Sequence, residues 1–193
     1  MLNLDNDING VILGIDEVGR GSLIGPVIVA GVIIKSSLKK FKEVNDSKKL
    51  SIIKREKLNT IIKDNAYCYF ASSNVAEIEE VNILQATLLA MRRIIKQVQK
   101  NYDHVLVDGI HSPDKTNKKI ILVPGGDSKS LSIAAASIIA KVKRDAIMKK
   151  FSKKYKEYHW HRNMGYGTQE HITAIKKYGP SPYHRLSFLK KII

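Results

Sequence analysis

The chain has 193 residues, and its 33 lysines and arginines against 18 acidic residues give a formal net charge of +15. Hydrophobic residues make up 44% of it and charged residues 26%, which excludes a disordered or fibrous chain. A single cysteine excludes an internal disulfide framework, and the longest apolar run, residues 23–34, is too short and too broken by glycine and proline to span a bilayer. We therefore expect a cytoplasmic protein with a polyanionic partner, nucleic acid before an anionic membrane surface.

The first elements predicted are two strands around a glycine-rich turn. The runs at residues 11–15 and 27–34 are expected to pair as antiparallel neighbours, with Asp16, Glu17 and then Gly19-Arg20-Gly21 between them. Neighbouring strand residues point to opposite faces, so both acids can converge only where the strand ends or twists. The glycines permit such a break. An acidic surface turn is the alternative, but charge between buried strands is costly unless a metal ion or hydrogen bonds compensate it.

The rest of the chain alternates between predicted helices and strands. Ser51, Asn82 and Thr168 are expected to cap helices. The first of these helices starts at residue 52, the second covers residues 83–99, and the third ends at residue 178. A further helix is predicted from just after residue 127 to about residue 155. Strands are predicted at residues 67–73, 104–107 and 120–123, and residues 181–193 are expected to form a tail.

Acidic residues recur at the predicted element ends. Asp108 directly follows a buried strand, and Asp127 precedes a helix after Gly125 and Gly126. In open α/β sheets, ligands bind at the carboxyl edge of the strands. Together with Asp16 and Glu17, these acids form an oxygen-only set that suits Mg²⁺ or Mn²⁺. Two such ions about 4 Å apart can hold the attacking water and the leaving oxygen of a phosphodiester.

The oxygen-only set favours a metal-dependent nuclease or phosphotransferase. A non-catalytic RNA-binding protein would explain the charge but not the placement of the acids. Lys141 and Arg144 share a helix face, where they could contact phosphate, although a solvated face or a simple Lys141–Asp145 pair would explain them too. Tyr166 lies between two glycines in an exposed turn.

Six motifs in chain order resemble the ribonuclease HII family, the bacterial type 2 ribonucleases H. They are Asp-Glu-Val-Gly-Arg-Gly at 16–21, Asp-Ser-Lys-Lys-Leu-Ser at 46–51, Asp-Gly at 108–109, Gly-Asp-Ser-Lys-Ser at 126–130, Ala-Ala-Ala-Ser-Ile-Ile-Ala-Lys-Val-Lys-Arg-Asp at 134–145 and Gly-Tyr-Gly-Thr at 165–168. The resemblance extends to the ending Gly-Pro-Ser-Pro-Tyr-His-Arg-Leu-Ser-Phe. Lys143 stands where the family usually has threonine. The sister family, ribonuclease HIII, usually carries an extra N-terminal domain and is not favoured by the Gly-Arg-Gly turn.

The resemblance implies an α/β ribonuclease H-like fold with a five-stranded mixed sheet flanked by helices. It further implies one catalytic domain over residues 1–193, with a C-terminal helical portion from about residue 156, and we expect a monomer. The implied activity is endonucleolytic hydrolysis of RNA in RNA–DNA hybrids and incision 5′ of single ribonucleotides in duplex DNA. The products would carry a 3′-hydroxyl and a 5′-phosphate, and two Mn²⁺ or Mg²⁺ ions would act in catalysis.

Motif position also implies a role for each site residue. Metal binding and catalysis fall to Asp16, Glu17, Asp108 and Asp127. The ribose 2′-hydroxyl, which alone distinguishes RNA from DNA at a given position, would be read by Gly19, Arg20, Gly21 and Tyr166. Phosphate contacts are implied for Lys141, Arg144, Lys48 and Lys49, with Asp145 orienting basic side chains.

Overall fold

The computed structural model describes residues 2, 4–35, 41, 44, 50–99, 101–190 and 192. The predicted phosphate contacts Lys48 and Lys49, and most of the Asp-Ser-Lys-Lys-Leu-Ser motif, lie outside the described residues.

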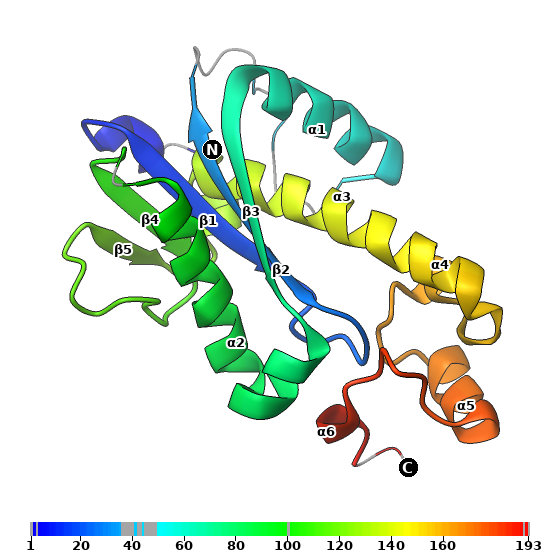
Figure 1. The fold of residues 1–193 in the computed structure, drawn as a ribbon. Helices are drawn as coiled ribbons and strands as arrows, with labels where there is room; N and C mark the ends of the chain where they lie inside the picture. The colour runs from blue at the N-terminus through cyan, green and yellow to red at the C-terminus, as the bar shows by residue number, and fades with distance from the viewer. Residues whose placement is uncertain are drawn as a thin grey trace.

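A five-stranded mixed sheet forms the centre of the molecule, as the resemblance implied (Figure 1). Its strand order is β3-β2-β1-β4-β5. The pairs β1–β2 and β2–β3 are antiparallel, whereas β1–β4 and β4–β5 are parallel. The strands are β1 (Ile12–Val18), β2 (Val27–Ile34), β3 (Ala66–Ser73), β4 (His104–Asp108) and β5 (Ile120–Val123).

Helices cover both faces of this sheet. The helices are α1 (Ile52–Asn65), α2 (Val75–Gln97), α3 (Leu131–Lys154), α4 (Trp160–Asn163), α5 (Gln169–Tyr178) and α6 (Leu186–Leu189), with 3-10 turns η1 (Leu4–Asp7), η4 (Gly126–Ser128) and η5 (Lys156–Tyr158). One hydrophobic cluster joins α1 and α3 to the sheet, and a second joins α2 to the opposite face. Figure 1 shows the two layers, with α2 on one side and α1 and α3 on the other.

Small residues allow α3 to lie very close to β1. A Cβ added at Gly14 would lie 2.3 Å from the main chain of Ser132, and the alanines at positions 134–136 are fully buried. Close backbone approach of this kind requires glycine on the strand. The consequence for the site is that α3 brings its own side chains, Ser137 among them, against the carboxyl end of β1.

The second helix differs from the prediction at its start. It begins at Val75, because Asn74 forms a capping box with Glu77. Asn82, the predicted cap, instead has φ 66° inside the helix and marks a kink. Its side chain still accepts hydrogen bonds from Leu84 and Gln85, at 3.0 and 3.1 Å, so it caps the second part of α2. The predicted caps Ser51 and Thr168 are confirmed at α1 and α5.

The predicted C-terminal tail packs onto the body of the protein instead. Its residues His184 and Arg185 are buried, and His184 pairs with Ile24 in an isolated antiparallel bridge. Beyond the end of α3, the short helices gather around a third cluster that contains Trp160 and Leu189 (Figure 1). Within the described residues, none of the helices combines the length and the hydropathy that a bilayer crossing requires.

Candidate active site

Two aspartates meet where the parallel strands β1 and β4 end. Ile15 pairs with Val107, so the next residues of the two strands, Asp16 and Asp108, are neighbours across the ladder. Asp16 is only 5% exposed and accepts a hydrogen bond from the Ser137 side chain on α3. Asp108 accepts a 2.7 Å bond from the amide of Gly126. This bond holds η4, which carries the predicted ligand Asp127, against the end of β4.

Glu17 follows Asp16 near the end of β1, and its carboxylate is close enough to Asp16 and Asp108 for their charges to interact. Its carboxylate is partly buried and lies 3.3 Å from the exposed guanidinium of Arg20. Burial raises the pKa of Asp16 well above its ordinary value, and the charges of Glu17 and Asp108 raise it further. Burial also raises the pKa of Glu17, against the opposing effect of Arg20. The structure therefore concentrates negative charge where water cannot fully solvate it.

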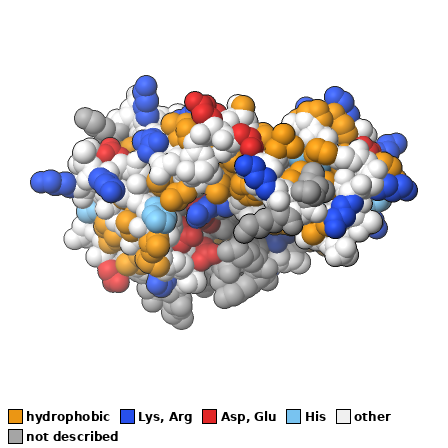
Figure 2. All heavy atoms as spheres, turned by 90° about the horizontal axis from the view of Figure 1, so that it is seen from below, with side chains coloured by type: hydrophobic (Ala, Val, Ile, Leu, Met, Phe, Trp, Pro, Cys, Tyr) orange, Lys and Arg blue, Asp and Glu red, His pale blue; other side chains and the backbone are white. Residues whose placement is uncertain are grey.

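The carboxylates of Asp16, Glu17 and Asp108 fit a hard divalent cation that also binds oxygen atoms of a substrate. Across the part of the chain that the structure describes, no three acidic, histidine or cysteine side chains are gathered closely enough to hold a metal ion by themselves. Mg²⁺ and similar ions are usually held by one or two carboxylates together with substrate phosphates and water. Figure 2 shows acidic side chains at the centre of the lower face, with lysines and arginines around them.

The raised pKa of Asp16 has a consequence for stability. A carboxyl whose folded pKa is raised destabilises the fold as pH increases through that pKa, and the effect vanishes well below its unfolded value. Asp16→Asn should therefore raise the melting temperature of the metal-free protein at pH 8, with a smaller gain at pH 5. A tenfold difference in proton affinity between the folded and unfolded states corresponds to about 1.4 kcal/mol, or about 3–6 °C for a chain of this size. Thermal melts in chelator between pH 5 and 9 measure the difference.

Asp5→Asn provides a control of opposite sign. The Asp5 carboxylate accepts bonds from the Leu131 and Ser132 amides, at 3.1 and 2.8 Å, at the start of α3. Negative charge there stabilises the helix, so its loss should lower the melting temperature. A lower melting temperature for Asp16→Asn at pH 8 would contradict the electrostatic account of the site.

Residues 19–25, which we call the reading loop, connect β1 to β2 and carry the predicted 2′-hydroxyl contacts. The Tyr166 turn packs directly on this loop: Leu23 N–H donates to the carbonyl of Gly165 at 2.9 Å, and so does the Ser22 hydroxyl. A Cβ at Gly165 would lie 2.5 Å from Ile24. The structure thus brings Gly19, Arg20 and Gly21 together with Tyr166, which is 37% exposed.

The two predicted phosphate contacts on α3 have different settings. Arg144 is fully buried, so its guanidinium does not reach the surface in this structure, and its predicted phosphate contact stays a prediction. It donates to the carbonyls of Met164 and Ile24, at 2.9 and 3.3 Å, and so lies beneath the reading loop. Lys141 is partly exposed and bonds Asp145 at 2.6 Å, which is the pairing considered as an alternative.

Sequence reasoning missed three buried residues of the C-terminal segment. Arg185 donates to carbonyls of the reading loop, and burial together with the nearby Arg144 lowers its pKa to about 9. His171 bonds the carbonyl of Tyr166 at 2.9 Å, and His184 lies 3.2 Å from the ring nitrogen of His171. Charged and polar residues near the end of a chain are typical of an exposed tail. The only signal was that Tyr183, His184 and Arg185 belong to the family-like ending.

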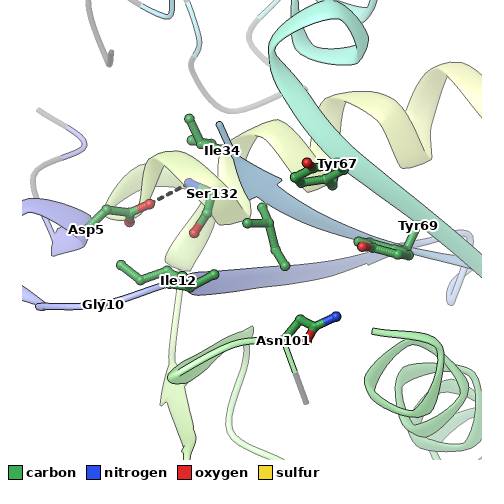
Figure 3. Close-up of a pocket in the computed structure, with 10 residues that line it drawn as sticks. Asp5, Gly10, Ile12, Ile34, Tyr67, Tyr69, Asn101 and Ser132 are labelled. Atoms are coloured by element: carbon green, nitrogen blue, oxygen red, sulfur yellow. Dashed lines mark hydrogen bonds between the residues drawn. The ribbon is translucent and has the colours of Figure 1, made fainter. Parts of the chain in front are cut away.

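A cavity of about 720 Å³ lies at the other end of the sheet, where β1 begins and β2 ends (Figure 3). Ile12, Ile34, Tyr67 and Tyr69 line much of it. The Asp5 carboxylate at its edge is already bonded to the start of α3, as the dashed line to Ser132 shows. The cavity therefore offers an apolar wall but not the group of acids found at the carboxyl end of β1.

Comparisons with known proteins agree with the resemblance. The family model described as Ribonuclease HII matches residues 13–191. The chain is 50% identical to a ribonuclease HII of Caldanaerobacter subterraneus over 183 residues, 94% of this chain and 75% of the relative. It is 47% identical to one of Paramagnetospirillum magneticum, over 97% and 94% of the two chains. Among solved structures, the ribonuclease HII in a complex with PCNA from Archaeoglobus fulgidus superposes with TM-score 0.78 at 26% identity, covering 91% and 94%.

Proposed function

The chain belongs to the ribonuclease HII family of endonucleases, and we propose that it hydrolyses RNA in RNA–DNA hybrids and incises duplex DNA on the 5′ side of a single embedded ribonucleotide. The observation that carries the proposal is the position of the reading loop. It follows directly after the acidic end of β1 and is packed against the Tyr166 turn. A group that contacts ribose and a group that holds metal would thus meet the same nucleotide.

Different residues of the chain would bind the metal ions, orient the carboxylates and contact the substrate phosphate. Asp16, Glu17, Asp108 and Asp127 would hold two Mg²⁺ or Mn²⁺ ions, which activate the attacking water and stabilise the leaving oxygen when bound. Ser137 and the Gly126 amide orient Asp16 and Asp108 by hydrogen bonds. Lys141 would contact a backbone phosphate by exchanging its bond to Asp145 for one to the substrate.

Recognition of the 2′-hydroxyl would fall to main-chain groups and one phenol. In the described part of the chain, the amides of Arg20 and Gly21 donate no hydrogen bond, and a Cβ at Gly21 would meet nothing within 4 Å. A sugar can therefore approach this backbone closely. The exposed Tyr166 lies over the guanidinium of Arg144, 5.6 Å from ring centre to Cζ, which fixes the ring beside the loop.

A duplex that contains one ribonucleotide tests the proposal. In Mn²⁺ or Mg²⁺, the enzyme should cut 5′ of the ribonucleotide and leave a 3′-hydroxyl and a 5′-phosphate. Because an activated water attacks, the neighbouring 2′-hydroxyl is not the nucleophile and no cyclic phosphate forms. Mass spectrometry of the fragments identifies the ends. A 2′,3′-cyclic end, equal cutting of an all-DNA duplex, or cleavage that persists in excess chelator would contradict the proposal.

Tyr166 variants separate recognition from the rest of the reaction. Tyr166→Ala should lower kcat/KM on the one-ribonucleotide duplex by about tenfold or more, as expected when a positioning contact is lost. The loss on a continuous hybrid should be smaller, since neighbouring riboses offer other registers. Tyr166→Phe keeps the ring over Arg144 and isolates the hydroxyl. Binding without cleavage in any metal would favour the alternative, a non-catalytic RNA-binding protein.

A further inference from the structure

Three carbonyls of the reading loop converge on the guanidinium of Arg185. Its Nη1 donates to the carbonyls of Arg20 and Ser22 at 3.0 and 2.8 Å. Its Nε and Nη2 both donate to the carbonyl of Gly25, at 3.0 and 2.8 Å. The main chain of the same segment adds bonds from Arg185 N–H to Leu23 and from Gly25 N–H to Tyr183, each 2.8 Å. Both ends of the loop and its middle are therefore tied to one side chain.

Burying the charged guanidinium of Arg185 at this position is energetically unfavourable by itself. It is fully buried, and among the residues that the structure describes it forms no ion pair with a carboxylate. A buried charge is destabilising unless hydrogen bonds compensate it. Here the compensating acceptors are the loop carbonyls. Only a planar fork of five N–H donors can serve three separate carbonyls at fixed directions, which the ammonium of lysine cannot do.

The bond to Arg20 has a geometric consequence for the next amide. The carbonyl of Arg20 and the N–H of Gly21 belong to one planar, trans peptide group, so they point in opposite directions. When Arg185 holds the carbonyl inward, the N–H of Gly21 must point outward. That amide donates to no described residue, and the space around Gly21 is open. Two glycines near predicted metal ligands, Gly109 and Gly125, differ in this respect, because no guanidinium of a described residue donates to the carbonyl that precedes either of them.

We propose that Arg185 is a positioning residue for ribose recognition: by holding the Arg20 carbonyl, it aims the Gly21 N–H at the 2′-hydroxyl of the substrate. This inference rests on the proposed function, because it assigns the open amide of the reading loop to the ribose. The competing explanation is that Arg185 only fastens the C-terminal segment to the body of the protein. In that case its loss would lower stability and would affect all substrates equally.

The first test compares two substrates. Arg185→Lys keeps the charge but cannot serve the three carbonyls, so kcat/KM on the one-ribonucleotide duplex should fall by about tenfold to 100-fold. The continuous hybrid, with several registers available, should lose clearly less. The matched control is Tyr158→Phe, which removes the 2.7 Å bond from the Tyr158 hydroxyl to the Gly179 carbonyl in the same C-terminal region but leaves the reading loop untouched. It should change the melting temperature and keep the ratio of the two substrates.

The second test observes the amide without catalysis. Glycine-selective ¹⁵N labelling gives a spectrum of at most 12 main-chain signals, because the chain has 12 glycines. The Gly21 signal is assigned by its disappearance in Gly21→Ala. In Arg185→Lys this signal should shift or broaden in the free protein, while the Gly109 and Gly125 signals stay in place. Titration with the one-ribonucleotide duplex in Ca²⁺ should shift the Gly21 signal of the wild type.

The outcomes separate the two claims. If the wild type cuts neither hybrid nor one-ribonucleotide duplex, the proposed function fails. If it cuts both, and folded Arg185→Lys keeps their ratio with an unmoved Gly21 signal, only the role of Arg185 is overturned. Should Arg185→Lys not fold, Phe188→Leu decides: it removes a ring that lies 5.2 Å from the guanidinium of Arg185, so the guanidinium is held less firmly against the loop carbonyls. The ratio should then fall about twofold to fivefold, as for a lost contact of roughly 0.5–1 kcal/mol, and an unchanged ratio overturns the inference.

Discussion

Asp108→Asn is expected to lower kcat by about 100-fold or more, which is the usual scale for losing a group that stabilises developing charge. Asparagine can still accept the 2.7 Å bond from Gly126, so η4 and β4 should stay joined and the fold should be retained. What is lost is the negative charge beside Asp16, so the binding of divalent cations should weaken. Substrate binding in the absence of metal should change little.

Asp103→Asn is a matched control for this substitution. Asp103 lies just before the other end of β4, and its carboxylate also accepts a main-chain bond of 2.7 Å, from Val11. It is remote from Asp16 and should keep activity within about twofold, as expected for a surface change of about 0.5 kcal/mol or less. Rates at saturating Mg²⁺ or Mn²⁺ decide the comparison. Substantial activity of Asp108→Asn under these conditions would remove Asp108 from the catalytic set.

Gly19→Ala should strongly reduce stability, whereas Gly21→Ala should hardly change it, although the two glycines are only two residues apart. Gly19 has φ +95°, and a Cβ there would lie 2.2 Å from Nε of the buried Arg144. A left-handed backbone costs an L-residue about 1–2 kcal/mol and overpacking adds about 1–3, so Gly19→Ala should lose about 2–5 kcal/mol of stability. Gly21→Ala meets no described atom and should stay within about 0.5 kcal/mol of the wild type.

The activity of Gly21→Ala should nevertheless fall, although its stability is nearly unchanged. Its added methyl group occupies the open space beside the amide that we assign to the ribose, so kcat/KM on the one-ribonucleotide duplex should fall by about tenfold or more. Denaturant unfolding gives the two stabilities, and cleavage rates below the melting transition give the activities. A fully active Gly21→Ala would show that substrate does not approach the loop at this residue.

The sequence could predict elements whose signals are local. Ser51 and Thr168 cap their helices as expected, since a cap needs only a side-chain oxygen and a nearby amide. The predicted start of α2 at Asn82 was wrong, because the helix already begins after the capping box of Asn74 and Glu77. The prediction was misleading because Asn82 does cap helical residues, inside α2. Two caps eight residues apart can be resolved only by the kink between them, which depends on how α2 packs over the sheet.

The candidate site was predictable only where its residues lie next to strand ends. Asp16 and Asp108 each close an apolar run, and parallel pairing then makes them neighbours. The burial of Arg144 and Arg185 could not be foreseen, because their partners are carbonyls, which every residue carries. A cation in a sequence indicates a surface or an acidic partner. Main-chain acceptors that converge from a distant loop leave no pattern in the residue types.

The long separation between the reading loop and its supports also orders events during synthesis. Arg20 and Arg185 are 165 residues apart, and Ser22 and Gly165 are 143 apart. At roughly 5–20 residues per second, a ribosome needs about 8–33 s to go from Arg20 to Arg185. Asp16, Glu17, Asp108 and Asp127 have all been made before the last of these supports. If the reading loop recognises ribose as we propose, the growing chain would acquire its carboxylates first, and would distinguish ribose from deoxyribose only once the segment around Arg185 docks.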